Sequence, residues 1–578
     1  MKKLKRYTKK VWELMQLPLK KHTWLFFFSY LLSVLLPLLG SCYGVQTGLF
    51  LPCFLSLFSC YLFCVLVTLL GHIRLAWLGY IVVLLPLVVE LFTLFIYHSL
   101  FCINVVQLIL ETDARESSEF LLSVLTGSSL WLVLLSMAVV GGLSWLFTWM
   151  VRRLRFSYVV QALVFVIISW AGARQMSTYK KLWMTYCART VSECADVVPH
   201  MTTPLVRFFY GVAFNHVATK EMDVLEASVR RLGAQSTGTG CPLIVLVIGE
   251  SFSKYHTPLY VADYRPVSPN LTKLRDQGNL VVFTDAVAPF NVTSNVFKRL
   301  FSTWDDSCSD DWTQHTLFTA LFRKAGYEVC FFTNQFVYNS NDNYDGLGGT
   351  IFNQSGLSRL QFSRRNKQKH DYDMELLDEL PSIDSLTQHP TLLIVHLIGQ
   401  HAKYAERYPA SETHFRASDV TANFGGESGR QTVAEYDNAT YYNDKVVGRL
   451  LNLFRSEDAI AFYLSDHGEE VLDWRDYFCR SNEENLSREV ARYQYEVPLL
   501  CCMTDTFQAR RPALADSIRA AASRPILSSD LSNVLLHLGG ISTDEYQAQH
   551  DFISEKYDKQ RKRIIRGDID YDALMKEQ

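Results

Sequence analysis

PLIVLVIGES, at residues 242–251, starts with seven apolar or proline residues and ends with Gly249, Glu250 and Ser251. A continuous run of β-branched and aliphatic residues is typical of a central strand in a parallel sheet that is covered on both faces. Similar runs recur at 327–332, 391–397 and 459–464, with helical patterns such as 317–325 and 436–454 between them. This alternation predicts an α/β sheet, whose functional site lies beyond the carboxyl ends of its strands.

Reactive side chains follow these runs. Glu250 comes after the first, Asn334 after the second and His401 after the third, and the fourth is followed by SDHGE, which contains Asp466 and His467. Glutamate, aspartate and histidine are suitable zinc ligands, and a catalytic zinc normally has three protein ligands and one open position. The sequence therefore predicts that distant segments bring metal ligands to one edge of the sheet.

The first third of the chain has a different composition. Residues 23–71 form a stretch of 49 residues without Asp, Glu, Lys, Arg or His, which is long enough for two membrane-spanning helices with a turn near 40–44. Further apolar segments at 75–100, 128–151 and 156–172 predict five spans in all. Glu90 lies inside the third span, where a carboxylate marks either a function or a buried polar partner.

Positive charges indicate the orientation of these spans. Lysine and arginine gather before the first span, at Arg74, and at 152–155. These positions are therefore expected on the cytoplasmic side, and everything after residue 172 on the outside. We predict a transmembrane domain at 1–172, amphipathic bridging helices at 173–239 and a soluble catalytic domain at 240–578.

Charge and cysteine content exclude other classes of protein. The net charge is −2 and no basic stripe alternates with aromatic residues, so a nucleic-acid partner is not expected. The 13 cysteines form no CxxC pair, which argues against a structural zinc ribbon. An outside domain could form disulfides, for instance with Cys308 or Cys479. The charge run at 556–566 predicts a solvated tail.

Several motifs together resemble the phosphoethanolamine transferases that decorate lipopolysaccharide. They are VIGES at 247–251, Thr293 at 43 residues after Glu250, HLIGQH at 396–401, YDNA at 436–439 with YND at 442–444, and SDHGEE at 465–470. ETDARESSE at 111–119 is similar to that family's periplasmic segment. The resemblance thus runs through nearly the whole chain. It implies a five-helix transmembrane domain followed by an α/β domain with an alkaline-phosphatase/sulfatase-like sheet.

The resemblance also implies a reaction in the bacterial inner membrane, with a periplasmic catalytic domain and a cytoplasmic N-terminus. Thr293 would take phosphoethanolamine from phosphatidylethanolamine, release diacylglycerol and pass the group to lipid A, core oligosaccharide or another envelope acceptor. Coordination to zinc is one way to activate a threonine hydroxyl. The implied Zn²⁺ ligands are Glu250, Thr293, Asp466 and His467, and the implied substrate contacts are Asn334, His401 and Glu116.

The sequence departs from the family pattern at two places. Asp113 stands where the family usually has asparagine, near the presumed donor site. Many relatives have a histidine about a dozen residues beyond the SDHGE motif, whereas 473–479 contains none. The missing histidine argues against a stable second zinc, so we expect one tight zinc site.

Simpler interpretations exist for single residues. Thr293 alone would be expected to cap a helix, and the neighbouring Ser294 is a rival nucleophile. His396 lies inside a strand run and is expected to be a core histidine.

Two other functions remain as alternatives. A phosphoglycerol transferase of the lipoteichoic-acid-synthase type would share the spans, the fold and the threonine nucleophile. A catalytically inactive membrane scaffold would keep the fold without the chemistry. A sulfatase is disfavoured because the Cys/Ser-x-Pro-x-Arg nucleophile motif is absent. The sequence does not indicate the acceptor, so lipid A, a core sugar, a periplasmic glucan and a protein all stay open.

Overall fold

The chain folds into two compact units. The computed structural model describes residues 2–42, 50–97, 128–188, 203–305, 308–336, 351–422, 424–481, 483 and 485–576. One unit comprises Met1–Glu221 with Ser481–Asn485, and the other comprises Met222–Arg480 with Leu486–Gln578. The division falls inside helix α9, Pro204–Arg231, which lies in the region where bridging helices are predicted.

The first unit is helical. It contains α1 Lys2–Lys21, α2 Thr23–Cys42, α3 Phe50–His72, α4 Ala76–Tyr97, α7 Ser128–Arg153 and α8 Tyr158–Cys187. Among the described residues, five of these helices, all but α1, are long and apolar enough to cross a membrane. The five predicted spans are therefore confirmed as apolar helices, although α8 continues 15 residues beyond the predicted end at 172.

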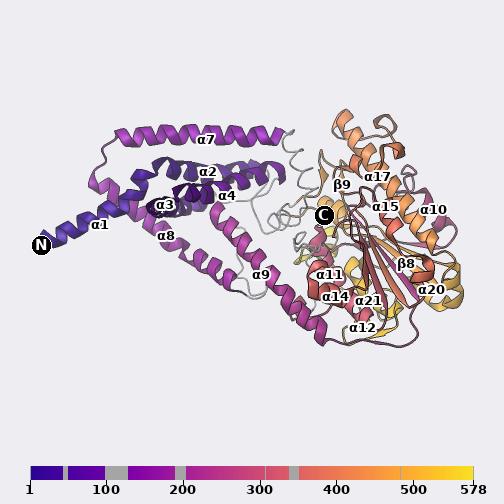
Figure 1. Ribbon diagram of the computed structural model, residues 1–578. Coiled ribbons are helices and arrows are strands. Elements are labelled where there is room, and N and C mark those ends of the chain that lie inside the picture. Colours follow the sequence, from indigo (N-terminus) through magenta and orange to yellow (C-terminus); the bar gives the residue numbers. More distant parts are fainter. Residues whose placement is uncertain are drawn as a thin grey trace. The chain divides into compact units, whose positions relative to one another are not determined.

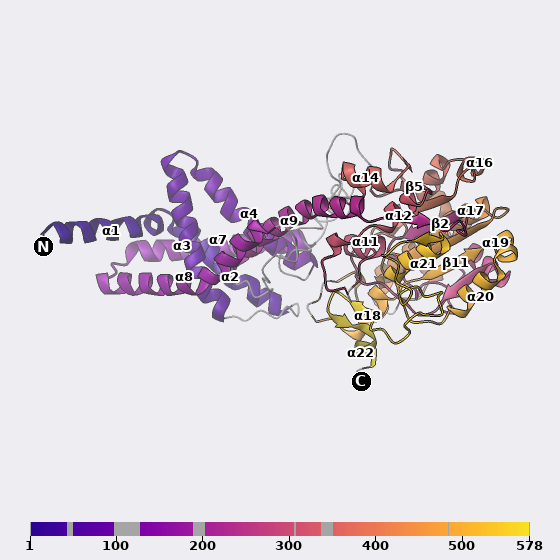
Figure 2. The same cartoon turned by 90° about the horizontal axis from the view of Figure 1, so that it is seen from below.

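Helix α1 is not anticipated by the sequence analysis. It extends away from the other helices of its unit in both views (Figures 1 and 2). Its second half packs on the bundle, where the Trp12 ring contacts the Phe165 ring at 5.3 Å. Lysine, tyrosine and valine side chains are exposed together along its first half, as in helices that lie at a membrane surface.

Glu90 in α4 has a charged partner. Its side chain is fully buried, and Arg207 of α9 donates from Nε to its Oε1 at 2.7 Å. A second Arg207 nitrogen also contacts the same oxygen. Of the two explanations for this carboxylate, the buried polar partner is the one that the structure supports.

The second unit is built on a seven-stranded sheet. Its strand order is β3 Leu280–Phe283, β11 Leu499–Met503, β8 Ala459–Ser465, β2 Leu243–Gly249, β7 Thr391–His396, β5 Glu328–Thr333 and β6 Arg364–Arg365. Strand β11 is antiparallel to both neighbours, and the other pairs are parallel. The four predicted runs are the four adjacent strands β8, β2, β7 and β5, so the predicted α/β fold is confirmed.

Both faces of the sheet are covered, which explains the continuous apolar runs. Along β2, Ile244, Leu246 and Ile248 enter one core, while Leu243, Val245 and Val247 enter the other. Helices α11 Thr293–Phe301, α12 Phe318–Lys324, α14 Ser355–Gln361 and α21 Leu531–Leu538 cover the first face. Helices α10 Pro269–Asp276, α15 Asp373–Leu376 and α17 Gly426–Leu453 cover the second (Figure 1).

Shorter elements complete this unit. The remaining α-helices are α16 Ile383–Leu386, α18 Arg488–Tyr495, α19 Asp505–Arg510, α20 Pro512–Ala520 and α22 Tyr571–Lys576. The two-stranded pairs are β1 Gln235–Ser236 with β13 Ile541–Ser542, β4 Ala286–Val287 with β12 Ile526–Leu527, β9 Glu470–Val471 with β10 Phe478–Cys479, and β14 Ile564–Ile565 with β15 Ile569–Asp570.

The C-terminal charge run is not a solvated tail, so that expectation is wrong. Arg561 is paired with Asp305 and Asp530, and Arg563 with Asp285 and Asp572. The Arg563 side chain is only 5% exposed. The run thus fastens the C-terminal segment to the domain. Among the cysteines that the structure describes, Cys308 and Cys479 are free thiols.

Candidate active site

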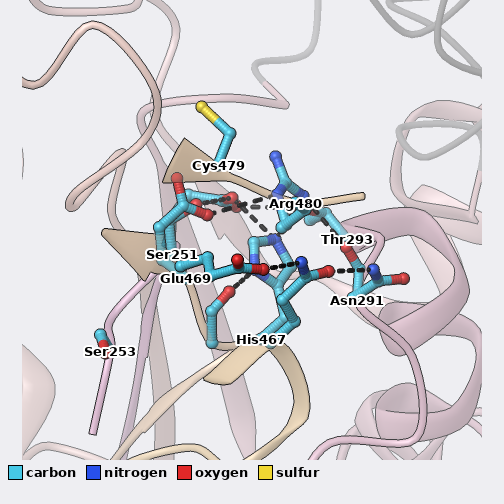
Figure 3. Close-up of polar contacts among 12 residues, drawn as sticks. Ser251, Ser253, Asn291, Thr293, His467, Glu469, Cys479 and Arg480 are labelled. Carbon is cyan, nitrogen blue, oxygen red and sulfur yellow. Dashed lines mark hydrogen bonds and ion pairs between the residues drawn. The ribbon is translucent and has the colours of Figure 1, made fainter. Parts of the chain in front are cut away.

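Four of the predicted site residues meet beyond the carboxyl ends of β2 and β8. The Thr293 hydroxyl oxygen lies 2.7 Å from Asp466 Oδ2 and 3.1 Å from Glu250 Oε2. It lies 3.4 Å from His467 Nε2, and Figure 3 shows these two side chains facing each other. The same Nε2 atom is 3.0 Å from Glu250 Oε1 and 3.1 Å from Asp466 Oδ2. One nitrogen and four oxygens, two of them from Glu250, therefore converge on a small space.

The sheet register brings these segments together. Gly249 pairs with Ser465 at the ends of β2 and β8, so Glu250 and Asp466 leave the sheet side by side. The chain turns sharply at Ser251, whose φ of 56° is left-handed, and the Ser251 amide donates to Asp466 Oδ1 at 3.2 Å. Such strained turns are found at functional sites, where they aim side chains.

The loop after β7 packs tightly against Glu250. Gly399 has a φ of 51°, and a Cβ atom there would lie 2.8 Å from the Glu250 nitrogen. Only glycine fits this position, because any side chain would both strain the backbone and displace Glu250.

Thr293 does not cap its helix. The N-cap of α11 is Val292, and Thr293 is the first helical residue, with its hydroxyl directed to the carboxylates. Ser294 is 2% exposed, and its hydroxyl makes no hydrogen bond within the described part of the chain. The hydroxyl of Thr293, and not that of Ser294, is therefore directed at the carboxylates, and Thr293 does not have the simple capping role.

The cluster concentrates negative charge away from water. Glu250, Asp466 and His467 are fully buried. Burial acts to raise the pKa of Glu250, but His467, His401 and Arg480 outweigh it and hold that pKa well below its usual range. Burial and repulsion from Glu250 raise the pKa of Asp466. Burial and Arg480 act to lower the pKa of His467, yet the two carboxylates prevail and raise it to about 9. A cation on His467 Nε2 would relieve this charge.

The donor atoms fit a zinc ion. His467 Nδ1 lies 2.9 Å from the Gly468 carbonyl, which accepts its proton and leaves Nε2 directed at the oxygens. Two carboxylates, an imidazole nitrogen and a hydroxyl are all donors that zinc accepts. Glu250, Asp466 and His467 offer ligand atoms that all lie within 4.8 Å of one another.

The predicted substrate contacts are placed unevenly. His401 is partly buried beside the cluster, and burial lowers the pKa of its imidazole to about 4 despite the charge of Glu250. The Asn334 side chain is hydrogen-bonded to other residues, since its amide donates to Asp373 at 3.0 Å and accepts from the His370 amide at 2.7 Å. Glu116 lies outside the described residues.

His396 is a core histidine, as expected. It is fully buried, its ring packs on Phe297 and Phe336, and burial lowers its pKa to about 4. An uncharged imidazole in this apolar setting is a packing residue.

Two site residues are missed by the sequence analysis. Arg480 Nη1 lies 2.6 Å from His467 Nε2 (Figure 3). Gln335 donates to the Leu397 carbonyl at 2.9 Å and to Glu250 Oε2 at 3.4 Å. The sequence offers one signal for Arg480, because this basic residue directly follows residues 473–479, the segment in which the family pattern has a histidine.

Comparisons with known proteins agree with this arrangement. The sequence model of the family described as Sulfatase matches residues 242–541. The phosphoethanolamine transferase EptC of Escherichia coli O18:K1:H7 is 28% identical over 344 residues, and the alignment covers 57% of this chain. It also covers 57% of that relative, so less than two thirds of the relative is matched.

Solved structures extend the comparison. The C-terminal periplasmic domain of EptC from Escherichia coli is 27% identical with a TM-score of 0.50, covering 59% of this chain and 96% of that one. A Zn complex of the same domain aligns at 24% identity with the same TM-score and coverage. The integral membrane protein lipooligosaccharide phosphoethanolamine transferase A from Neisseria meningitidis has a TM-score of 0.60 at 17% identity, over 92% of this chain and 98% of that one. The fold, a helical unit followed by an α/β unit, is therefore shared along almost the whole chain.

Proposed function

Because the chain belongs to the sulfatase family and its reactive side chains meet beyond β2 and β8, we propose that it is a zinc-dependent phosphoethanolamine transferase. One observation carries the proposal: the Thr293 hydroxyl lies 2.7 Å from the buried Asp466 carboxylate, in contact with the other metal ligands. The relative EptC is named a phosphoethanolamine transferase, which supports phosphoethanolamine as the transferred group. Sulfate ester hydrolysis is disfavoured because the sulfatase nucleophile motif is absent.

The proposed reaction has two steps. The Thr293 oxygen forms a bond to the phosphorus of phosphatidylethanolamine while the bond from phosphorus to the diacylglycerol oxygen breaks, and that oxygen takes up a proton. An acceptor hydroxyl or phosphate then attacks the phosphorus of the phosphoethanolamine–threonine diester and gives up its proton, the bond from phosphorus to Thr293 breaks, and the threonine oxygen takes up a proton. Covalent catalysis of this kind divides one difficult transfer into two easier ones.

The residues of the chain have distinct roles in these steps. Asp466 accepts the proton of the Thr293 hydroxyl, and Glu250 and His467 complete the ligand set. The amino end of α11, where Thr293 stands, favours the negative charge of a bound phosphoryl group. A bound Zn²⁺ would lower the pKa of the Thr293 hydroxyl and so supply the nucleophile. The Zn complex of the EptC domain supports this choice of metal.

Substrate contacts remain part of the proposal. His401 would donate a hydrogen bond to the phosphoryl group from its neutral ring. Asn334 would use only the amide hydrogen that Asp373 leaves free, and Glu116 would bind the ethanolamine.

We place the protein in the bacterial inner membrane, with a cytoplasmic N-terminus and a periplasmic catalytic domain at 240–578. Lipid A and core oligosaccharide are the first acceptors to test.

One experiment tests donor and nucleophile together. Purified full-length protein with zinc is incubated with head-group-labelled phosphatidylethanolamine, and diacylglycerol and the intact mass of the protein are measured. We expect diacylglycerol release and a phosphoethanolamine adduct, both lost in Thr293→Ala and both kept in the matched control Ser294→Ala. An adduct that survives Thr293→Ala would refute the nucleophile.

The alternatives give different results in the same assay. Diacylglycerol release from phosphatidylglycerol but not from phosphatidylethanolamine would indicate the phosphoglycerol branch. Turnover with neither donor, together with full cellular function of a zinc-free protein, would indicate a scaffold.

A further inference from the structure

Arg480 is a cation inside the site that the reaction described above does not use. It follows β10, and its side chain is 23% exposed, so the guanidinium is neither fully buried nor free in solvent. Nη1 lies 2.6 Å from His467 Nε2 and 3.2 Å from the Asn291 carbonyl oxygen. Figure 3 shows the guanidinium beside His467 and close to Thr293.

The contact between Arg480 and His467 cannot persist once Nε2 is occupied. An imidazole nitrogen has one lone pair, which accepts from Arg480 only while it carries neither a proton nor a metal ion. Asp466, Glu250 and Thr293 oxygens all lie within 3.4 Å of the same nitrogen and favour a cation there. In the loaded site, Nη1 therefore loses a partner and keeps its hydrogen bond to the Asn291 carbonyl oxygen.

The guanidinium is held in place when this contact is lost. Its Nε lies 3.5 Å from Glu469 Oε2, and Glu469 is itself fixed by the Tyr404 hydroxyl at 2.7 Å. The hairpin that precedes Arg480 is anchored at Asp473, which contacts His256 Nε2 at 3.0 Å. Arg480 is therefore preorganised, with its fork beside the nucleophile.

We infer that Arg480 binds the phosphoryl oxygens of the group being transferred and supplies the second positive charge of a site with a single metal ion. A guanidinium fork matches two phosphoryl oxygens, and a fixed cation beside the reacting phosphorus stabilises the charge of the transition state. The inference rests on the proposed transfer of a phosphoryl group to Thr293. It assigns to an arginine the charge that a second zinc would otherwise bring.

The test compares binding rather than turnover alone. Zinc-loaded full-length protein is titrated with inorganic phosphate as the probe, and bound zinc is counted by mass spectrometry. We expect one zinc per chain in the wild type, and phosphate binding that is weakened on the order of 10- to 100-fold in Arg480→Gln. Arg480→Lys, which keeps one charge but not the fork, should fall between the two.

Zinc affinity separates this role from a structural one. Arg480→Gln removes a positive charge beside His467, so the variant should bind zinc at least as tightly as the wild type while it binds phosphate more weakly. A loss of zinc and phosphate affinity together would mean that Arg480 only holds His467 in place, and would overturn the inference. If Arg480→Gln does not fold, Arg480→Lys decides on the same two readouts. Arg455→Gln, at an exposed arginine on another segment, is the matched control and should change neither.

Failure of the inference and failure of the proposed function are distinguishable. Unchanged phosphate affinity in Arg480→Gln, with an adduct on Thr293 in the wild type, would reject the inference and leave the function standing. Weakened phosphate binding in a protein that forms no adduct from phosphatidylethanolamine would support Arg480 and reject the donor. Two zinc ions per wild-type chain would contradict the single-metal site directly.

Discussion

Two buried carboxylate sites in this molecule are neutralised in different ways. In the helical unit, Glu90 faces the guanidinium of Arg207, one negative charge against one positive charge. In the catalytic unit, Glu250, Asp466 and Glu469 are all buried around His467 and Arg480, so three acidic groups share two basic ones. The first arrangement pairs opposite charges directly, and the second has room for a further cation. This difference separates an ion pair between two helices from a site where we propose that a metal ion binds.

The largest effect is expected at Asp466, in the site where acidic groups outnumber basic ones. Asp466→Asn removes a zinc ligand and the group that accepts the Thr293 proton, so the transfer rate should fall on the order of 10³-fold. The metal-free variant should unfold at a higher temperature than the metal-free wild type, because a repelling buried carboxylate is gone. Diacylglycerol release and thermal unfolding with and without chelator measure the two effects.

Asp476→Asn is the control for that change, since Asp476 is exposed on the neighbouring hairpin loop. A metal-free Asp466→Asn protein that is less stable than the metal-free wild type would contradict the view that this site holds more negative charge than positive charge.

In the Glu90–Arg207 pair, removal of the carboxylate should lower the stability of the protein. Glu90→Gln leaves the Arg207 guanidinium without its carboxylate in a buried place, and this should cost about 3 kcal/mol of stability. The folded fraction should keep its transfer activity. Unfolding in detergent, followed by intrinsic fluorescence, measures the loss.

A double variant sharpens that measurement. Glu90→Gln combined with Arg207→Gln should recover part of the stability, because no uncompensated charge remains. A double variant that is as unstable as the sum of the single variants would show that the pair is not coupled.

The pH dependence of zinc binding is a third, smaller effect. The raised pKa of His467, about 9, means that the ring holds a proton below that pH and that zinc must displace it. Zinc affinity should therefore rise about tenfold per pH unit between pH 7 and pH 9 and level off above. Calorimetry in buffers of different ionisation enthalpy counts the proton released. An affinity independent of pH would mean that His467 is not a ligand.

The smallest effect is expected from Gln335. Its contact with Glu250 is long, at 3.4 Å, and Glu250 keeps the hydrogen bond from the Ser251 hydroxyl at 3.0 Å. Gln335→Ala should therefore lower the transfer rate by less than about tenfold. A loss as large as that of Asp466→Asn would show that Gln335 touches the reacting group.

The parts of the fold that are buried on two sides were predictable from sequence. Strands β2, β5, β7 and β8 each carry a long apolar run because both faces meet a core. Strands β3 and β11 were not predicted, although β11 joins β3 to the rest of the sheet. Helix α1 was missed for a different reason, since its basic residues were interpreted only as an orientation signal.

The same distinction applies to the site. Glu250, Asp466 and His467 follow rigid central strands, so their sequence position already fixes their place. Arg480 follows a hairpin of two-residue strands whose position depends on the His256–Asp473 contact, and nothing local in the sequence announces that contact. The charges at Arg561 and Arg563 were misjudged likewise, because a run of basic residues does not reveal the distant aspartates that pair with it.

Helix α8 is longer than a bilayer requires. Its 30 residues span about 45 Å, while the hydrocarbon core is about 30 Å thick. The surplus begins near the predicted end of the span, where the apolar sequence gives way to Arg174 and Gln175. The helix therefore continues for 15 residues past the predicted end of the span, a projection of about 22 Å. Deleting one turn from this projection would shorten it by about 5 Å.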